Sequence, residues 1–118
     1  MADSDFIAAL DAASELDLTV TGRRSGRESM RPVWFVRDED KLYLVPIDGV
    51  DSEWYKNVLA RPDVRVAVRG TELRVHAKPV AKRGRVGEIV AAFRTKYGDA
   101  SFDRYYPRPD AAVELPLT

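Results

Sequence analysis

Several residue types that build catalytic and metal sites are scarce in this chain. Its 118 residues include no cysteine and a single histidine, His76. The lack of cysteine excludes disulfides, thiolate metal sites and a cysteine nucleophile. One histidine excludes a multi-histidine metal site and argues against a histidine-centred triad, and we expect His76 to lie on the polar face of its strand. If the protein is an enzyme, a cofactor should therefore supply the chemistry.

The chain also lacks a net charge and a long apolar segment. Its 19 basic residues balance 19 acidic ones, so no global field draws the protein to nucleic acid. No stretch approaches the roughly 18 apolar residues of a membrane span. The N-terminus lacks the basic-then-apolar order of a secretion signal. These absences predict a cytoplasmic, soluble protein without a membrane partner, and the length predicts one domain over residues 1–118.

Positive charge is nevertheless concentrated in one segment near the N-terminus. Four arginines fall within nine residues, at Arg23, Arg24, Arg27 and Arg31. Only Glu28 offsets them, and Gly22 and Gly26 allow a tight turn between two apolar runs. Arginine presents a planar fork of donors that matches phosphate or carboxylate. The segment is therefore either a local anion site or a solvated hairpin tip whose arginines pair with nearby acidic side chains.

The hydrophobic pattern predicts a mainly β (α+β) fold. Helices are expected from Asp3 or Ser4 to about Glu15, over 53–60, and from about Val86 to Tyr97. Strands are expected over 17–22, 30–37, 41–47, 64–69, 73–78 and 113–117, the last at a sheet edge because of Pro116. Most strands follow one another as hairpins, which favours an antiparallel sheet or small barrel with helices at its ends.

Two of these strands, 30–37 and 41–47, are apolar on both faces. A strand buried on both sides needs two covers. One cover is the core of the domain. The other is a helix, a bound ligand or a second subunit.

Two further segments carry chemistry-bearing side chains. Residues 46–57 end a strand, turn at Gly49 and begin a helix, whose free N–H groups either bind an anion or are capped by Asp51 and Ser52. Residues 93–108 interleave basic and aromatic side chains. This pattern is typical of single-stranded nucleic-acid sites, and also of a helix C-terminus with basic residues in its last turn and packed aromatic side chains after it. Nucleic-acid binding is the least favoured function because the net charge is zero.

An ordered set of motifs over about residues 16–80 resembles the deazaflavin-dependent nitroreductase family. The motifs are Thr19-Val20-Thr21-Gly22-Arg23-Arg24-Ser25-Gly26, then Arg31-Pro32, Lys41-Leu42-Tyr43-Leu44-Val45, Trp54-Tyr55-Lys56-Asn57-Val58 and Ala60-Arg61-Pro62-Asp63-Val64-Arg65-Val66. The family's usual order is T-x-T-G-R-x-S-G, a basic residue with proline, a strand, W-Y-x-N-L, then A-N-P-x-V-x-V. It belongs to the split-barrel, flavin-reductase-like group that includes pyridoxamine phosphate oxidases.

The resemblance implies a split antiparallel β-barrel with flanking helices, a homodimer, and a deazaflavin (coenzyme F-420) or FMN in a groove beside the barrel. It implies an oxidoreductase that moves a hydride between this cofactor and a small organic acceptor. The cofactor-binding positions that match are Arg23, Arg24, Ser25, Arg27, Arg31, Pro32, Ile47, Asp48, Gly49, Trp54, Tyr55 and Asn57. Trp34 is a cofactor-binding candidate that would bound the ring pocket. Tyr43 is a further candidate for the ring pocket, and Tyr105 and Tyr106 are candidate proton donors.

One position departs from the family pattern. Deazaflavin binders usually carry a serine–lysine pair before the glycine, whereas this chain has Ile47 and Asp48 before Gly49. An aspartate near a phosphate is repulsive, at a cost of a few kcal/mol if desolvated. The alternatives are use of FMN, a different binding mode for the deazaflavin, or a non-catalytic split-barrel protein that binds a small anion or serves as a dimeric partner.

Overall fold

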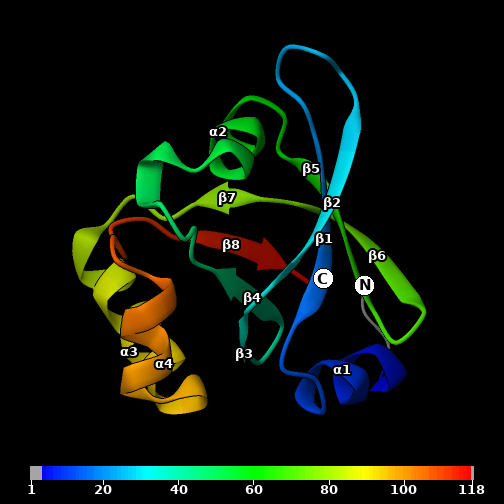
Figure 1. The fold of residues 1–118 in the computed structure, drawn as a ribbon. Coiled ribbons are helices and arrows are strands. Elements are labelled where there is room, and N and C mark those ends of the chain that lie inside the picture. The colour runs from blue at the N-terminus through cyan, green and yellow to red at the C-terminus, as the bar shows by residue number, and fades with distance from the viewer. Residues whose placement is uncertain (1–3, 118) are drawn as a thin grey trace.

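The computed structural model describes residues 4–117, which form two four-stranded antiparallel sheets and four α-helices (Figure 1). The strands of the first sheet, in spatial order, are β2 (Glu28–Val33), β1 (Leu16–Thr21), β5 (Asp63–Val68) and β6 (Thr71–His76). Those of the second are β3 (Val36–Asp38), β4 (Lys41–Leu44), β8 (Val113–Pro116) and β7 (Lys78–Pro79). The helices are α1 (Ser4–Asp11), α2 (Glu53–Ala60), α3 (Arg83–Tyr97) and α4 (Asp99–Tyr105), with a 3₁₀ turn η1 (Gly49–Asp51) before α2. The predicted α+β class is confirmed.

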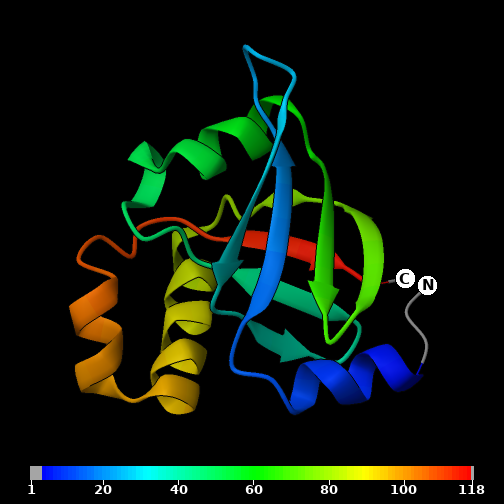
Figure 2. The ribbon, with the colours of Figure 1, turned by 45° about the vertical axis from the view of Figure 1, so that its right-hand side comes forward.

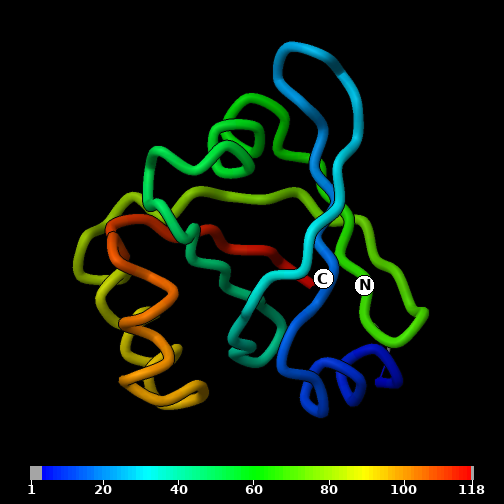
Figure 3. Tube along the Cα trace, viewed as in Figure 1, coloured from blue at the N-terminus to red at the C-terminus, as the bar shows by residue number. Residues whose placement is uncertain are grey.

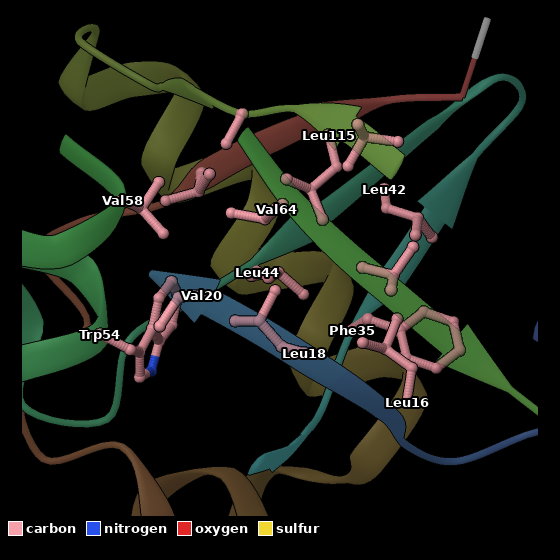
Figure 4. Packing of buried hydrophobic residues seen from close by; sticks show 14 of the residues in the cluster. Leu16, Leu18, Val20, Phe35, Leu42, Leu44, Trp54, Val58, Val64 and Leu115 are labelled. Atoms are coloured by element: carbon pink, nitrogen blue, oxygen red, sulfur yellow. The ribbon is translucent and has the colours of Figure 1, made fainter. Parts of the chain in front are cut away.

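The main core lies between the two sheets and under α2 (Figure 4). Strand β1 alternates as its sequence predicts, with Leu16, Leu18 and Val20 all buried. They meet Leu42 and Leu44 of β4 from the opposite sheet, and Trp54 of α2 closes one end beside Val20. Burial of these side chains accounts for most of the driving force that holds the sheets together.

A second core covers the other face of β4. Tyr43 and Val45 point away from the main core and pack with buried side chains of α3 and α4, among them Phe93 and Phe102. The two helices lie side by side against this sheet (Figure 1). Leu42 to Val45 are therefore buried on both faces of the strand, as predicted, and the second cover is a helical layer. The strand ends at Leu44 rather than at Ile47, which is 49% exposed.

The prediction of one strand over 30–37 is wrong. Strand β2 ends at Val33 in the first sheet and β3 begins at Val36 in the second, so the chain crosses between sheets at Trp34 and Phe35. Side chains of β2 are exposed rather than buried, and Met30 keeps 66% of its surface accessible. The apolar pattern was misleading because β2 is a sheet edge, of which only Val33 is partly buried against the main core.

The crossing between the sheets is fixed by a tyrosine of α3. The Tyr97 hydroxyl accepts a hydrogen bond from the Phe35 backbone N–H at 3.0 Å and donates to the Ser14 carbonyl oxygen at 2.7 Å. Lys96 donates to the Phe35 carbonyl oxygen at 2.8 Å. Polar backbone groups at the crossing are thus paired, as buried groups must be.

Four further elements differ from the predicted ones. Helix α1 ends at Asp11 rather than near Glu15, and the expected cap Asp3 lies outside the described residues. Strand β7 and helix α4 were not predicted. Strand β8 is not at an edge, because it pairs with β4 on one side and β7 on the other. Pro116 is tolerated there because the two-residue β7 pairs only with Val113 and Glu114 and stops short of it.

The β1–β2 hairpin extends beyond the rest of the molecule (Figures 2 and 3). Its tip closes with a hydrogen bond from the Gly22 N–H to the Arg27 carbonyl oxygen at 2.8 Å. Gly26 adopts a φ of 72°, which a residue with a Cβ rarely does. Within the described residues, no helix combines the length and the apolar character that crossing a membrane requires.

Candidate functional site

A cavity of about 600 Å³ lies where the two sheets part, between the β2–β3 crossing, the segment before α2 and the end of α4. Its lining is Glu15, Arg31, Pro32, Val33, Trp34, Val45, Ile47, Asp48, Ser52, Glu53, Trp54, Tyr105 and Tyr106. A cavity of this volume, with aromatic and apolar walls and a few polar groups, is typical of a small-molecule or cofactor site.

Hairpin register explains why distant residues meet here. Leu16 of β1 pairs with Val33 of β2, so Glu15 and Trp34, the residues just beyond that pair, lie at the same end of the hairpin. Arg31 pairs with Leu18, and its side chain reaches the cavity wall from the open edge of the sheet. On the other wall, β4 runs on through Val45 to the segment that carries Ile47 and Asp48.

An aromatic cluster centred on Trp34 forms one wall. The Trp34 ring stacks on Tyr97 with centroids 4.0 Å apart and planes 7° from parallel. Tyr105 meets the indole edge-on at 5.2 Å, and Tyr106 lies 5.9 Å away. Stacked and edge-to-face arrangements of this kind are the favoured aromatic geometries. The indole is therefore held in one orientation before any ligand arrives.

The tyrosines of this aromatic cluster differ in their burial. Burial raises the pKa of Tyr97 to about 12 and raises the pKa of Tyr106 as well, so both stay protonated at neutral pH. Tyr105 is 49% exposed. Of the two predicted proton donors, Tyr105 is the one that can exchange a proton directly with solvent.

The four arginines of the hairpin separate into three environments. Arg31 lines the cavity. Arg23 is already committed, because its guanidinium contacts Glu53 at 2.8 Å and donates to Asn57 Oδ1 at 2.8 Å. Arg24 and Arg27 are exposed near the tip and do not line the cavity. Arg23 thus pairs with an acidic side chain, as the second alternative predicts, while Arg31 lines the cavity.

The Arg23 contacts tie the hairpin to α2. The Arg23 backbone N–H also donates to Asn57 Oδ1, at 3.1 Å. Its hydrogen bond to Glu53 lowers the pKa of that carboxyl. Asn57, predicted to bind cofactor, is occupied by this tie, and the Ser25 hydroxyl accepts the Arg27 N–H at 3.1 Å within the turn.

Gly49, Tyr55 and Tyr43 are placed outside the cavity. Gly49 has a φ of 59°, and a Cβ there would lie 2.7 Å from the Arg108 carbonyl oxygen. Its glycine therefore serves close packing of the chain. Tyr55 packs in the main core, where burial raises its pKa, and Tyr43 faces the helical layer, where its hydroxyl accepts a hydrogen bond from Arg85 at 2.8 Å.

The predicted site residues are thus only partly brought together. Those that line the cavity are Arg31, Pro32, Trp34, Ile47, Asp48, Trp54, Tyr105 and Tyr106. Those that do not are Arg23, Arg24, Ser25, Arg27, Gly49, Tyr55 and Asn57. Ser52 is also part of the wall, and its hydroxyl accepts the Asp48 N–H at 2.8 Å instead of capping α2.

Sequence reasoning missed Glu15, Val33, Val45, Ser52 and Glu53 as lining residues. For Glu15 a signal was available: a hairpin pairs the start of its first strand with the end of its second, so the residue before β1 must lie near Trp34. For Val45 the strand pattern predicts only that the side chain is buried. Whether it lines the cavity depends on where the two sheets separate, which the pattern does not show.

The chemistry of the lining can be compared with the group that the sequence resemblance implies. Trp34, Trp54, Val45 and Ile47 offer aromatic and apolar surface to a planar ring, and Arg31 offers a donor fork to one anionic group. These residues fit the ring of a flavin-type cofactor and a single anionic contact, and the same lining also holds the carboxylates of Glu15, Asp48 and Glu53. No group of acidic and histidine side chains suited to a metal ion occurs in the part of the chain that the structure describes.

Solved structures share this architecture at low sequence identity. One is described as an "F420-H2 Dependent Reductase (FDR-A)"; it is 23% identical, the match covers 86% of this chain and 93% of that one, and the TM-score is 0.68. Another, from Listeria innocua, is described as a "Putative Pyridoxamine 5'-phosphate oxidase", with 16% identity, 97% and 92% coverage and a TM-score of 0.72. A "nimc/nima family protein" from Clostridium acetobutylicum is 17% identical over 93% and 76%, with a TM-score of 0.68.

These similarities confirm the split-barrel fold that the motifs predicted. A match to a sequence family extends over nearly the whole chain. Residues 6–112 match the family described as "Uncharacterized protein conserved in bacteria (DUF2255)", and the chain belongs to that family.

Proposed function

We propose that the protein is an oxidoreductase that binds FMN or a deazaflavin in the cavity beside the barrel and passes a hydride between it and a small organic acceptor. The observation that carries the proposal is the preorganised Trp34 wall, held by Tyr97 at 4.0 Å in a cavity of about 600 Å³. Fixed aromatic walls with one convergent cation are suited to a planar ring with an anionic substituent.

The roles of the chain's own residues follow from their positions. Trp34 and Trp54 bound the ring, and Arg31 holds the first anionic group of the tail. Arg24 and Arg27 on the hairpin beyond the cavity meet the remainder of a longer tail. Arg23 keeps the hairpin against α2 through Glu53 and Asn57 and so positions Arg31 rather than contacting the ligand.

The electron balance is simple. When bound in its reduced form, the cofactor would supply a hydride, which carries two electrons and one proton, and the products would be the oxidised cofactor and the reduced acceptor. An acceptor that takes up a proton as well as the hydride would receive it from the Tyr105 hydroxyl, which solvent re-protonates because the side chain is 49% exposed. Tyr106, buried with a raised pKa, acts as a hydrogen-bond donor in the wall.

The proposal is tested by equilibrium titration of the protein with FMN, riboflavin and a deazaflavin, followed by visible absorbance. We expect FMN to bind about fivefold to tenfold more tightly than riboflavin, because Arg31 pairs with the phosphate. The Arg31→Gln variant should remove that difference and leave riboflavin binding unchanged. Glu72→Gln, on the far strand β6, is the control.

Failure of all three ligands to bind at tens of micromolar would contradict the proposal. Binding without turnover across a panel of acceptors would favour a second candidate, a non-catalytic flavin- or small-anion-binding protein. Asp48 motivates that candidate, because it stands where the sequence resemblance expects a lysine and so opposes the phosphate of a redox cofactor.

We further propose a homodimer, formed through the uncovered β2 edge. A relative described as a "domain-swapped dimer" has the same fold at 23% identity, covers 86% of this chain and has a TM-score of 0.68. In one chain β2 is an unpaired edge whose Met30 is 66% exposed, and such edges are usually protected. Sedimentation equilibrium should give the mass of two chains, which Met30→Lys should reduce to one. A wild-type monomer at all concentrations would rule the dimer out.

A further inference from the structure

The charges on the cavity wall do not all suit an anionic ligand. Arg31 faces Glu15, Asp48 and Glu53 in the same lining. Glu53 is neutralised by Arg23 at 2.8 Å. Among residues 4–117, the carboxylates of Glu15 and Asp48 make neither an ion pair nor a hydrogen bond. Arg108 is the other nearby cation. Its pKa is raised mainly by its hydrogen bond to Asp51 at 2.6 Å and to a smaller extent by the Asp48 carboxylate, so its guanidinium is already paired.

The uncommitted carboxylates share the cavity with an electron-rich aromatic wall. Tyr97 covers one face of the Trp34 indole, so a ligand meets the ring at its other face or edge. Tyr105 and Tyr106 adjoin the indole within 6 Å and line the same cavity. Indole and phenol rings attract cations through their quadrupole, and the attraction grows where water is excluded. Carboxylates beside such rings strengthen it.

We infer that the second ligand of the cavity, the organic acceptor, is a planar cation such as an N-alkylated aromatic ring. Glu15 and Asp48 supply its counter-charge, and Tyr105 and Tyr106, which line the same cavity, supply its aromatic contact, because the free face of Trp34 receives the cofactor ring. This division of charge explains why one cavity holds both an arginine and two uncommitted carboxylates: Arg31 serves the anionic cofactor and the carboxylates serve the acceptor. The redox role of the cation rests on the proposed function, but its binding does not.

The inference is tested on the protein without cofactor, with three soluble ligands of one skeleton. These are 1-methylnicotinamide, a cation, nicotinamide, which is neutral, and nicotinate, an anion. Calorimetric titration should rank the cation first and the anion last, with the cation about tenfold tighter than the neutral ring.

Two isosteric variants separate charge from shape. Asp48→Asn and Glu15→Gln should each weaken binding of 1-methylnicotinamide by about threefold to fivefold and leave nicotinamide unchanged. Glu72→Gln removes a carboxylate at the far edge of the first sheet and should change neither. Unaltered nicotinamide affinity also shows that the variants are folded.

The inference is overturned if nicotinate binds as tightly as the cation, if none of the three binds, or if the two variants leave the cation affinity unchanged. These outcomes are independent of the flavin titration. Cation binding without FMN binding would contradict the proposed function alone, and FMN binding without cation preference would contradict this inference alone.

Discussion

Replacing Trp34 with alanine should weaken FMN binding by about 30-fold to 100-fold. The substitution removes the stacking surface, and burial of a large aromatic surface together with a ring–ring contact accounts for about 2–3 kcal/mol. It also leaves Tyr97 without its parallel partner at 4.0 Å. Absorbance titration of both proteins measures the change.

Trp34→Phe is the matched variant, because it keeps an aromatic face at the same position. We expect it to lose less than about tenfold in affinity, since the smaller ring retains part of the contact. Circular dichroism before and after urea unfolding checks that both variants are folded. A folded Trp34→Ala protein that binds FMN like the wild type would remove Trp34 from the ring site.

Replacing Phe102 with alanine should lower the free energy of unfolding by about 3–5 kcal/mol. Phe102 is fully buried between the helical layer and the second sheet. It stacks on Tyr106 at 4.8 Å, meets Phe93 at 6.1 Å and lies under the Arg94 guanidinium at 4.7 Å. The variant leaves a large cavity beside α4, and because Tyr106 lines the functional cavity, ligand binding should weaken as well.

Urea unfolding of Phe102→Ala and of Leu59→Ala measures this effect against a surface change. Leu59 is 50% exposed on α2, and its loss should alter stability by less than about 0.5–1 kcal/mol. Equal stability of Phe102→Ala and the wild type would show that the helical layer does not depend on its aromatic cluster.

Local pattern was enough to predict much of the fold. The strands around Leu18, Val64 and Val75 alternate strictly, and their predicted positions match β1, β5 and β6 to within one or two residues. Helix α2 was predicted over its full range because Pro62 follows it closely. The hydrophobic pattern of each of these elements matches its burial within one sheet or layer. Their positions can therefore be predicted without knowledge of distant segments.

Elements whose environment is set by distant segments could not be predicted this way. The β2–β3 crossing depends on Tyr97, which reaches Phe35 from 62 residues away. Pro116 suggested an edge strand, whereas the shortness of β7 allows it an interior position. In the site, motif positions identified Arg31, Trp34 and Trp54, but only the structure shows that Arg23 and Asn57 are occupied by each other.

The central claim, that the Trp34 wall receives a planar cofactor ring, is tested most directly by the fluorescence of Trp34 itself. The chain has two tryptophans, so Trp54→Phe leaves Trp34 as the only indole emitter. Because a ring stacked on the indole quenches its emission, we predict saturable loss of most of the Trp34 signal when FMN or a deazaflavin is added to tens of micromolar. A folded Trp54→Phe protein whose emission stays unchanged by both ligands would contradict the claim.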